Sequence, residues 1–95
     1  MLAIINAELV LRDHFLPDAY LIVEDGIIKD FGEMSAFSGD GYMETLDARG
    51  MYLAPGLVDI YSHTGGEFQA WKNPIEAARF HLLRGITTTQ FLPRL

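Results

Sequence analysis

The sequence contains no cysteine and few basic residues, and both shortages exclude classes of function. Without cysteine there are no disulfides and no thiolate ligands, so any metal ion depends on His, Asp and Glu. Seven Lys and Arg residues stand against thirteen Asp and Glu residues, which gives a formal net charge of −6. The seven cations form no cluster along the chain, and this distribution argues against a nucleic-acid surface.

Long apolar runs are also missing. No run approaches the ~18 residues of a membrane span, and the amino terminus lacks the basic region of a signal peptide. We therefore predict a protein without a membrane segment, located in the cytoplasm. The 95 residues, of which 49% are apolar, suit one small folded domain and not a disordered tail.

The residue pattern of the first half of the chain is typical of a β-sheet. The segments AIINAELVL and AYLIVEDGIIKDFG are rich in β-formers, and the second contains Asp25-Gly26, a strong hairpin signal. Residues 32–43 show no periodicity and contain three glycines, so we expect a loop there. Two short extended pieces then flank the turn Asp47-Ala48-Arg49-Gly50. Together these segments predict a small antiparallel sheet.

After Pro55-Gly56 the pattern changes to strand, helix, strand. LVDIYSH is short and apolar, which is typical of a strand buried on both faces in a parallel sheet. Asn73 and Glu76 have the spacing of a capping box around Pro74, and Gly85 predicts the end of the helix. Its apolar positions are Ile75, Ala78, Leu82 and Leu83. ITTTQFLP follows as a second strand, parallel to the first.

Three histidines could carry chemistry. His14 lies in a polar connection and His81 within the predicted helix, so we expect structural or surface roles for both. His63 closes the predicted buried strand, at the end where α/β folds place their sites. Because successive side chains of a strand point to opposite faces, His63 shares one face with Asp59 and Tyr61. Residue chemistry alone leaves His63 open as a metal ligand or a hydrogen-bonded structural histidine.

The glycine pair that follows His63 has two possible meanings as well. Gly65 and Gly66 permit positive φ and close approach of the backbone to a ligand, but a Gly-Gly pair is also an ordinary loop. Neither motif identifies a site by itself.

Two stretches, and a spacing within the second of them, carry a family resemblance. They are the hairpin VEDGIIKDFGE, the segment LDARGMYLAPGLVDIYSHTGG, and the spacing D-A-x-G-x-x-x-x-P-G-x-x-D from Asp47 to Asp59. This order resembles the amino-terminal segment of the amidohydrolase superfamily, in which a small β-sandwich built from both chain ends packs on a metal-bearing (β/α)8 barrel. RGITTTQFLPRL is similar to the equivalent segment of N-acetylglucosamine-6-phosphate deacetylases. The resemblance implies an α+β fragment: residues 1–54 as part of the sandwich and residues 55–95 as the first strand, helix and strand of the barrel.

The resemblance also implies a site. The superfamily's His-x-His falls on Tyr61-Ser62-His63, so His63 is the implied metal ligand and Tyr61 replaces the first histidine. Tyr61, Gly65 and Gly66 are then expected to line the substrate site. Tyr61 marks either a one-metal enzyme or an enzyme that has lost its metal, and the sequence leaves this choice open.

The implied parent protein is a metal-dependent hydrolase of C–N bonds in small-molecule amides, with an N-acetyl amino sugar phosphate as a candidate substrate. A divalent metal ion, with zinc as the expected ion, activates water in such enzymes. Because the other family ligands and the general base lie in later segments, we expect these 95 residues alone to be inactive and to bind no metal.

An alternative belongs to a different class. Unfinished sheet edges and an uncovered apolar strand–helix–strand face favour pairing with another chain. The chain is then a non-catalytic β-rich module that self-associates or binds a partner, and a homo-oligomer is the expected state.

Overall fold

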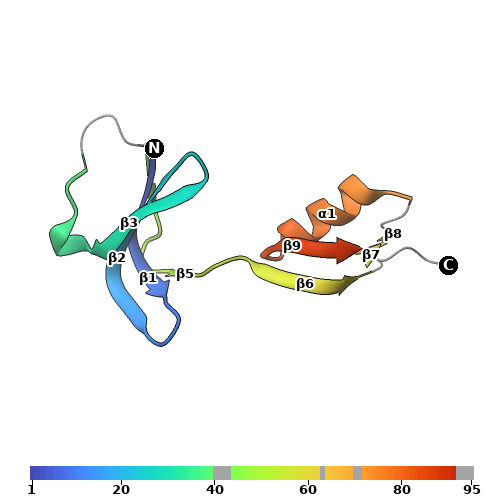
Figure 1. Cartoon of the computed structure of the whole chain (residues 1–95), viewed down its shortest axis with the longest axis horizontal. Coiled ribbons are helices and arrows are strands. Elements are labelled where there is room, and N and C mark those ends of the chain that lie inside the picture. The colour runs from blue at the N-terminus through green and yellow to red at the C-terminus, as the bar shows by residue number, and fades with distance from the viewer. Residues whose placement is uncertain (40–43, 63, 70–71, 92–95) are drawn as a thin grey trace. The chain divides into compact units, whose positions relative to one another are not determined.

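The computed structural model describes residues 1–39, 44–62, 64–69 and 72–91 (Figure 1). The chain divides into two compact units, Met1–Pro55 and Gly56–Leu95. The boundary expected from the sequence, between residues 54 and 55, lies one residue earlier. We describe each unit by itself.

Unit 1 is a mixed sheet with one short 3-10 helix. Its elements are β1 (Leu2–Val10), β2 (Phe15–Glu24), β3 (Ile27–Glu33), η1 (Met34–Ala36), β4 (Glu44–Asp47) and β5 (Tyr52–Leu53). The strand order is β3-β2-β1-β4, and β5 also pairs with β1. Asp25 and Gly26 have φ values of 53° and 76° and join β2 to β3. The predicted hairpin is therefore confirmed, since both central residues adopt the left-handed conformation of a type I′ turn.

The prediction of an antiparallel sheet is wrong for two strands. β1 pairs with β2, and β2 with β3, in antiparallel fashion, but β4 and β5 both run parallel to β1. Leu2 lies opposite Glu44, and Glu8 lies opposite Tyr52. The physical reason is that no tight hairpin joins β3 to β4. β4 begins at the start of β1, where Glu44 lies opposite Leu2, and therefore runs in the same direction as β1, whereas a tight hairpin gives opposite directions.

The turn between β4 and β5 explains the Asp47 motif in structural terms. One carboxylate oxygen of Asp47 accepts hydrogen bonds from the Arg49 backbone N–H at 2.8 Å and from the Asn6 side-chain amide at 3.2 Å. These two bonds hold the pKa of Asp47 below its ordinary value of 3.8, and the bond from the Arg49 backbone is the larger cause. Gly50 has φ of 79°, and its N–H donates to the Asn6 carbonyl at 2.7 Å. The motif thus fastens the turn to β1.

We expect acid to weaken unit 1 through Asp47. A carboxylate whose pKa is lowered in the folded state stabilises the fold above its unfolded pKa, and this contribution is lost as the pH falls through the folded value. The loss should therefore begin below about pH 4. The urea midpoint of Asp47→Asn should fall less than that of the wild type over this range, because asparagine keeps an acceptor but does not ionise. Some acid dependence should remain, since His14 also lowers the pKa of Asp13. Parallel pH profiles for the two proteins would contradict this role.

The core of unit 1 is small and lies on β1 and β2. Ala7, Leu9 and Ala19 are buried together, and Leu9 is 1% exposed. Partly buried apolar side chains surround them: Ile4, Leu11, Leu16, Leu21, Ala48 and Leu53. The core therefore draws on strands distant in sequence, including β5.

A second packed region in unit 1 surrounds Tyr20. Its hydroxyl donates to Asp30 at 2.8 Å, and this bond raises the pKa of Tyr20. The Tyr20 ring lies 5.2 Å from the ring of Phe37, centroid to centroid. A side chain at Gly32 would meet the Tyr20 ring at 3.3 Å. These contacts attach β3 and the segment after η1 to β2.

Unit 2 contains two pairs of strands and one helix. Its elements are β6 (Leu57–Ser62), β7 (Thr64–Gly65), β8 (Phe68–Gln69), α1 (Pro74–Leu82) and β9 (Ile86–Phe91). β6 and β9 are parallel, as predicted, and β7 and β8 form a short antiparallel pair. The predicted helix is confirmed as well, with Pro74 in its first turn and Gly85 following it at φ of 86°. That β6, α1 and β9 begin a (β/α)8 barrel, and that unit 1 is part of a sandwich, stays a prediction.

Three details of unit 2 differ from the predictions. Asn73 occupies the N-cap position, but its side chain makes no capping hydrogen bond. The expected apolar stripe of α1 faces solvent, with Ile75 72% exposed and Leu83 75% exposed, whereas Ala77 is buried. β6 is not buried on both faces either, since Ile60 is 75% exposed. The reason is that α1 packs on β7, β8 and β9 and the described residues offer no further layer.

The helices of the described residues are too short and too polar to span a membrane. The predicted cytoplasmic location stays a prediction.

Candidate functional site

The carboxyl end of β6 is where the sequence places the candidate site. β6 and β9 are parallel, so their carboxyl ends lie at one edge of the sheet, and Ser62 is opposite Phe91 in the register. This edge is where open α/β sheets bind ligands. α1 and the β7–β8 pair connect the two strands.

The structure describes the predicted site residues only in part. His63 lies outside the described residues, and of Tyr61 the structure gives the backbone, in β6, but not the side chain. Gly65 is in β7, and Gly66 is in the turn between β7 and β8. Asp59 is half-buried in β6 and lies opposite Thr89 of β9. The roles assigned to His63, Tyr61, Gly65 and Gly66 therefore stay predictions.

The described residues do not by themselves form a metal centre. Among residues 1–39, 44–62, 64–69 and 72–91, no group of three or more His, Asp or Glu side chains comes together in a way that could hold an ion. A zinc site needs three or four such ligands.

The other two histidines have structural partners. His14 Nδ1 and Asp13 Oδ1 are 2.6 Å apart, and both side chains are exposed. His81, in α1, is half-buried, and its Nε2 lies 3.2 Å from the hydroxyl of Ser62. The hydrogen bond joins residues 19 positions apart, so no local pattern in the sequence predicts it. It ties the helix to the end of β6.

Thr89 carries a polar atom that sequence reasoning missed. Its hydroxyl is buried and has no hydrogen-bond partner in the described part of the chain. Strand propensity explains the run Thr87 to Thr89 well enough, so the sequence gives no reason to single out one hydroxyl. A buried polar group without a partner is uncommon and unfavourable.

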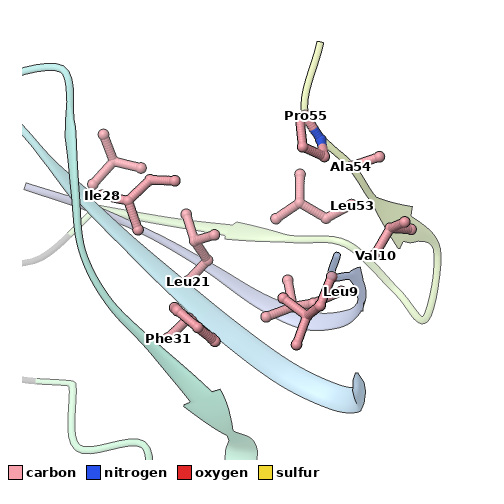
Figure 2. A pocket seen from close by; sticks show the side chains of 10 residues that line it. Leu9, Val10, Leu21, Ile28, Phe31, Leu53, Ala54 and Pro55 are labelled. Carbon is pink, nitrogen blue, oxygen red and sulfur yellow. The ribbon is translucent and has the colours of Figure 1, made fainter. Parts of the chain in front are cut away.

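Unit 1 has an apolar groove of about 300 Å³. Figure 2 shows Leu9, Leu21 and Phe31, from three adjacent strands, lining the hollow together with Leu53 and Pro55. Its other lining residues are Val10, Leu11, Val23, Ile28 and Ala54. Because no ionisable side chain lines it, the groove can bury apolar groups but supplies no acid, base or metal ligand.

Comparison with known proteins supports a family relationship. No model of a protein family matches the chain. A dihydroorotase of Wolbachia sp. subsp. Drosophila simulans is 41% identical over 69 residues, which cover 73% of this chain and 15% of the relative. A dihydroorotase of Enterococcus faecalis is 30% identical over 91 residues, covering 95% of this chain and 21% of the relative. An imidazolonepropionase of Acinetobacter baumannii is 30% identical over 50 residues, or 53% of this chain and 12% of the relative. The chain thus spans only a small part of the length of these relatives.

Two solved structures share the fold. The crystal structure of an amidohydrolase aligns with a TM-score of 0.70 and 22% identity, over 93% of this chain and 24% of that one. A molinate hydrolase aligns with a TM-score of 0.67 and 20% identity, over 93% of this chain and 23% of that one. Relatives and structures together support the amidohydrolase superfamily, and the fold is a mixed, sheet-rich α+β arrangement that matches parts of these hydrolases. None of these relatives is named as a deacetylase.

Proposed function

We propose that this chain is the amino-terminal part of a metal-dependent amidohydrolase that hydrolyses a C–N bond. In this proposal β6, α1 and β9 begin a (β/α)8 barrel, and unit 1 contributes to a β-sandwich beside it. The main support is the similarity to a dihydroorotase along 95% of the chain, through both units and the end of β6. The parallel pairing of β6 and β9 is the geometry that such a barrel requires.

His63 is the metal ligand that this chain contributes in the proposal, with Tyr61, Gly65 and Gly66 lining the substrate site. A divalent ion such as zinc supplies an activated water in this class of chemistry. The described residues hold no complete ligand set, so we propose that the remaining ligands and the general base belong to later segments of a longer protein. For this reason we assign no catalytic step to the 95 residues.

The substrate in this proposal is a small molecule with an amide or related C–N bond. The names of the relatives favour dihydroorotate or imidazolonepropionate as test compounds, whereas the resemblance of RGITTTQFLPRL favours N-acetylglucosamine 6-phosphate. These compounds form a panel that separates a hydrolase of ring C–N bonds from a deacetylase.

The test uses the full-length gene product and the 95-residue chain side by side. We expect the full-length protein to hydrolyse one compound of the panel, to lose activity on treatment with a chelator, and to recover it with Zn²⁺. His63→Ala should lower kcat/KM by at least about 100-fold, since loss of a metal ligand should cost no less than loss of one of its supporting residues. The control is His14→Ala, which removes the exposed histidine next to Asp13 and should leave kcat/KM unchanged.

The 95-residue chain should show no hydrolysis with any metal. Metal-dependent hydrolysis by this chain alone, lost in His63→Ala, would overturn the proposal that later segments complete the site. Full activity of the full-length protein without metal would overturn the metal-dependent class.

We propose self-association of the isolated chain as a second, non-catalytic property. The observation that favours it is the number of large apolar side chains that face solvent. In unit 1 they include Phe15, Ile27, Ile28, Phe31, Leu46, Met51 and Tyr52, and in unit 2 Leu57, Val58, Ile60, Ile75, Leu82 and Leu83. Three of them, Leu57, Val58 and Ile60, belong to the single strand β6. Large apolar patches on a surface mark sites that bind another chain. Light scattering after size exclusion should give a mass at least twice 10.6 kDa, and a monomer that resists concentration would refute this.

A further inference from the structure

Helix α1 contacts the chain on both sides of position 63. On one side, the Ser62 hydroxyl and His81 Nε2 share a hydrogen bond of 3.2 Å. Ser62 is 8% exposed and His81 half-buried, so little water competes for this bond. Both tautomers of His81 allow it, because a hydroxyl can donate to a bare ring nitrogen or accept from a protonated one.

On the other side, Phe80 packs against Gly66. A Cβ on Gly66 would lie 2.7 Å from Cδ2 of Phe80, so the ring occupies the space that any side chain would need. Gly66 also has φ of 63°, a conformation that glycine adopts without strain. The Phe80 ring is held in turn by the Arg84 guanidinium, which lies 3.9 Å from its centroid.

Phe80 and His81 are neighbours on α1, about 100° apart around its axis. One therefore reaches the turn after β7 and the other reaches the end of β6. We propose that Phe80 and His81 are positioning residues: His81 fixes Ser62, at the end of β6, and Phe80 fixes Gly66, in the turn after β7, against α1. This inference rests on the proposed function, in which the metal ligand and the substrate-lining glycines adjoin these two points.

The reason that such a role matters is geometric. A ligand or lining group works only when its surroundings hold it near the productive position, and supporting residues outside the site commonly provide that restraint. Ordinary packing of a helix on a sheet would also give these two contacts. The two explanations differ in whether the loss of one hydrogen bond changes metal affinity when the fold itself is kept.

The first experiment measures amide hydrogen exchange in the 95-residue chain without metal. In Ser62→Ala and His81→Phe, the amides of residues 62–66 should exchange at least about fivefold faster, since at least one hydrogen bond is lost in each variant. The amides of β9 should be unaffected. His81→Gln places a carboxamide near the position of Nε2 and should restore the wild-type rates.

The second experiment measures Co²⁺ binding by the full-length gene product through its visible absorption. Ser62→Ala and His81→Phe should raise the dissociation constant by about tenfold, the lower end for supporting residues of a metal site. His81→Gln should stay within about threefold of the wild type on the same scale. The matched control is His14→Phe, the same substitution at the exposed histidine of unit 1, which should leave Co²⁺ binding unchanged.

The outcomes separate the two proposals. Unchanged exchange at residues 62–66 in both breaking variants would overturn the positioning role, and so would equal Co²⁺ affinities in all variants. A loss of affinity that His81→Gln does not restore would also count against it, since the hydrogen bond would then be irrelevant. A wild-type protein that binds no Co²⁺ would overturn the proposed function, while the exchange rates would still decide whether α1 fixes this segment.

Discussion

Gly56→Ala is expected to separate β6 from β9 and to lower the stability of unit 2 by about 3 kcal/mol. Gly56 lies directly before β6 and against the side chain of Thr87 in β9. A Cβ at position 56 would overlap the Thr87 hydroxyl and methyl groups and would lie 2.6 Å from its Cβ. Rotation of the Thr87 side chain can move the hydroxyl and the methyl group but not the Cβ, which is fixed to the backbone. The strands therefore have to move apart.

The measurement is native-state hydrogen exchange of the Leu57 amide, which donates to the Gly85 carbonyl at 2.8 Å. This bond joins the start of β6 to the residue before β9, so its opening reports the separation of the strands. The Leu57 amide should lose most of its protection in Gly56→Ala.

Two further variants test the mechanism at Gly56. Thr87→Ala should not rescue Gly56→Ala, because the clash with the Cβ remains, whereas Thr87→Gly should rescue it in part. Gly50→Ala is the comparison for backbone strain alone, since Gly50 has φ of 79° and a Cβ there would meet no atom within 4 Å. Its expected cost is about 1–2 kcal/mol, in unit 1 only. Equal costs of Gly56→Ala in the wild-type background and in the Thr87→Gly background would refute the steric explanation.

Leu9→Ala is expected to lower the stability of unit 1 by about 2–3 kcal/mol. Leu9 is the largest fully buried side chain of the described residues. It belongs to the core cluster and lies on β1, an inner strand of the sheet. It lies opposite Leu16 of β2 and Leu53 of β5, so its removal loosens both edges of β1. The effect should fall in the lower part of the range for leucine, because Leu9 also lines the open groove and its loss enlarges that groove without creating a closed void.

The matched control for Leu9 is Leu46→Ala. Leu46 lies in β4, which also pairs with β1, but 56% of its surface is exposed. Its truncation should change the free energy of unfolding by about 0.5 kcal/mol or less. Exchange of the β1 and β2 amides in urea gives both values, and similar losses for the two variants would contradict the burial argument.

The sequence predicted those features of the fold that depend on neighbouring residues. The hairpin at Asp25-Gly26 and the end of α1 at Gly85 follow from positive φ, which glycine and aspartate adopt most readily. The parallel direction of β6 and β9 followed from a helix between two short apolar strands, because a connection of that kind returns the chain to the same end of the sheet.

For the candidate site, the structure confirms only the strand that begins after Pro55-Gly56, described as far as Ser62, and the site at its end stays a prediction. The bond between Ser62 and His81 was not foreseen. Likewise, Gly66 was interpreted as a permissive loop residue, whereas the structure adds a packing reason, the ring of Phe80. Contacts of this kind depend on how α1 is rotated against the strands.

By itself the sequence predicted the strands of the hairpin and its turn, the strand–helix–strand order of β6, α1 and β9, and the end of the helix, because these depend on backbone preferences and on apolar spacing within a few residues. It did not predict η1 and the end of β3, which lie in an expected loop, or the β7–β8 pair. Only the tertiary structure decided that β4 and β5 run parallel to β1, and that α1 buries Ala77 while exposing Ile75 and Leu83. Strand direction depends on the path of a long connection, and the buried face of a helix depends on which surface it meets. The local pattern does not encode the buried face of α1, because this helix carries apolar residues on both sides. It does not encode the strand direction either, because that depends on residues far apart in the chain.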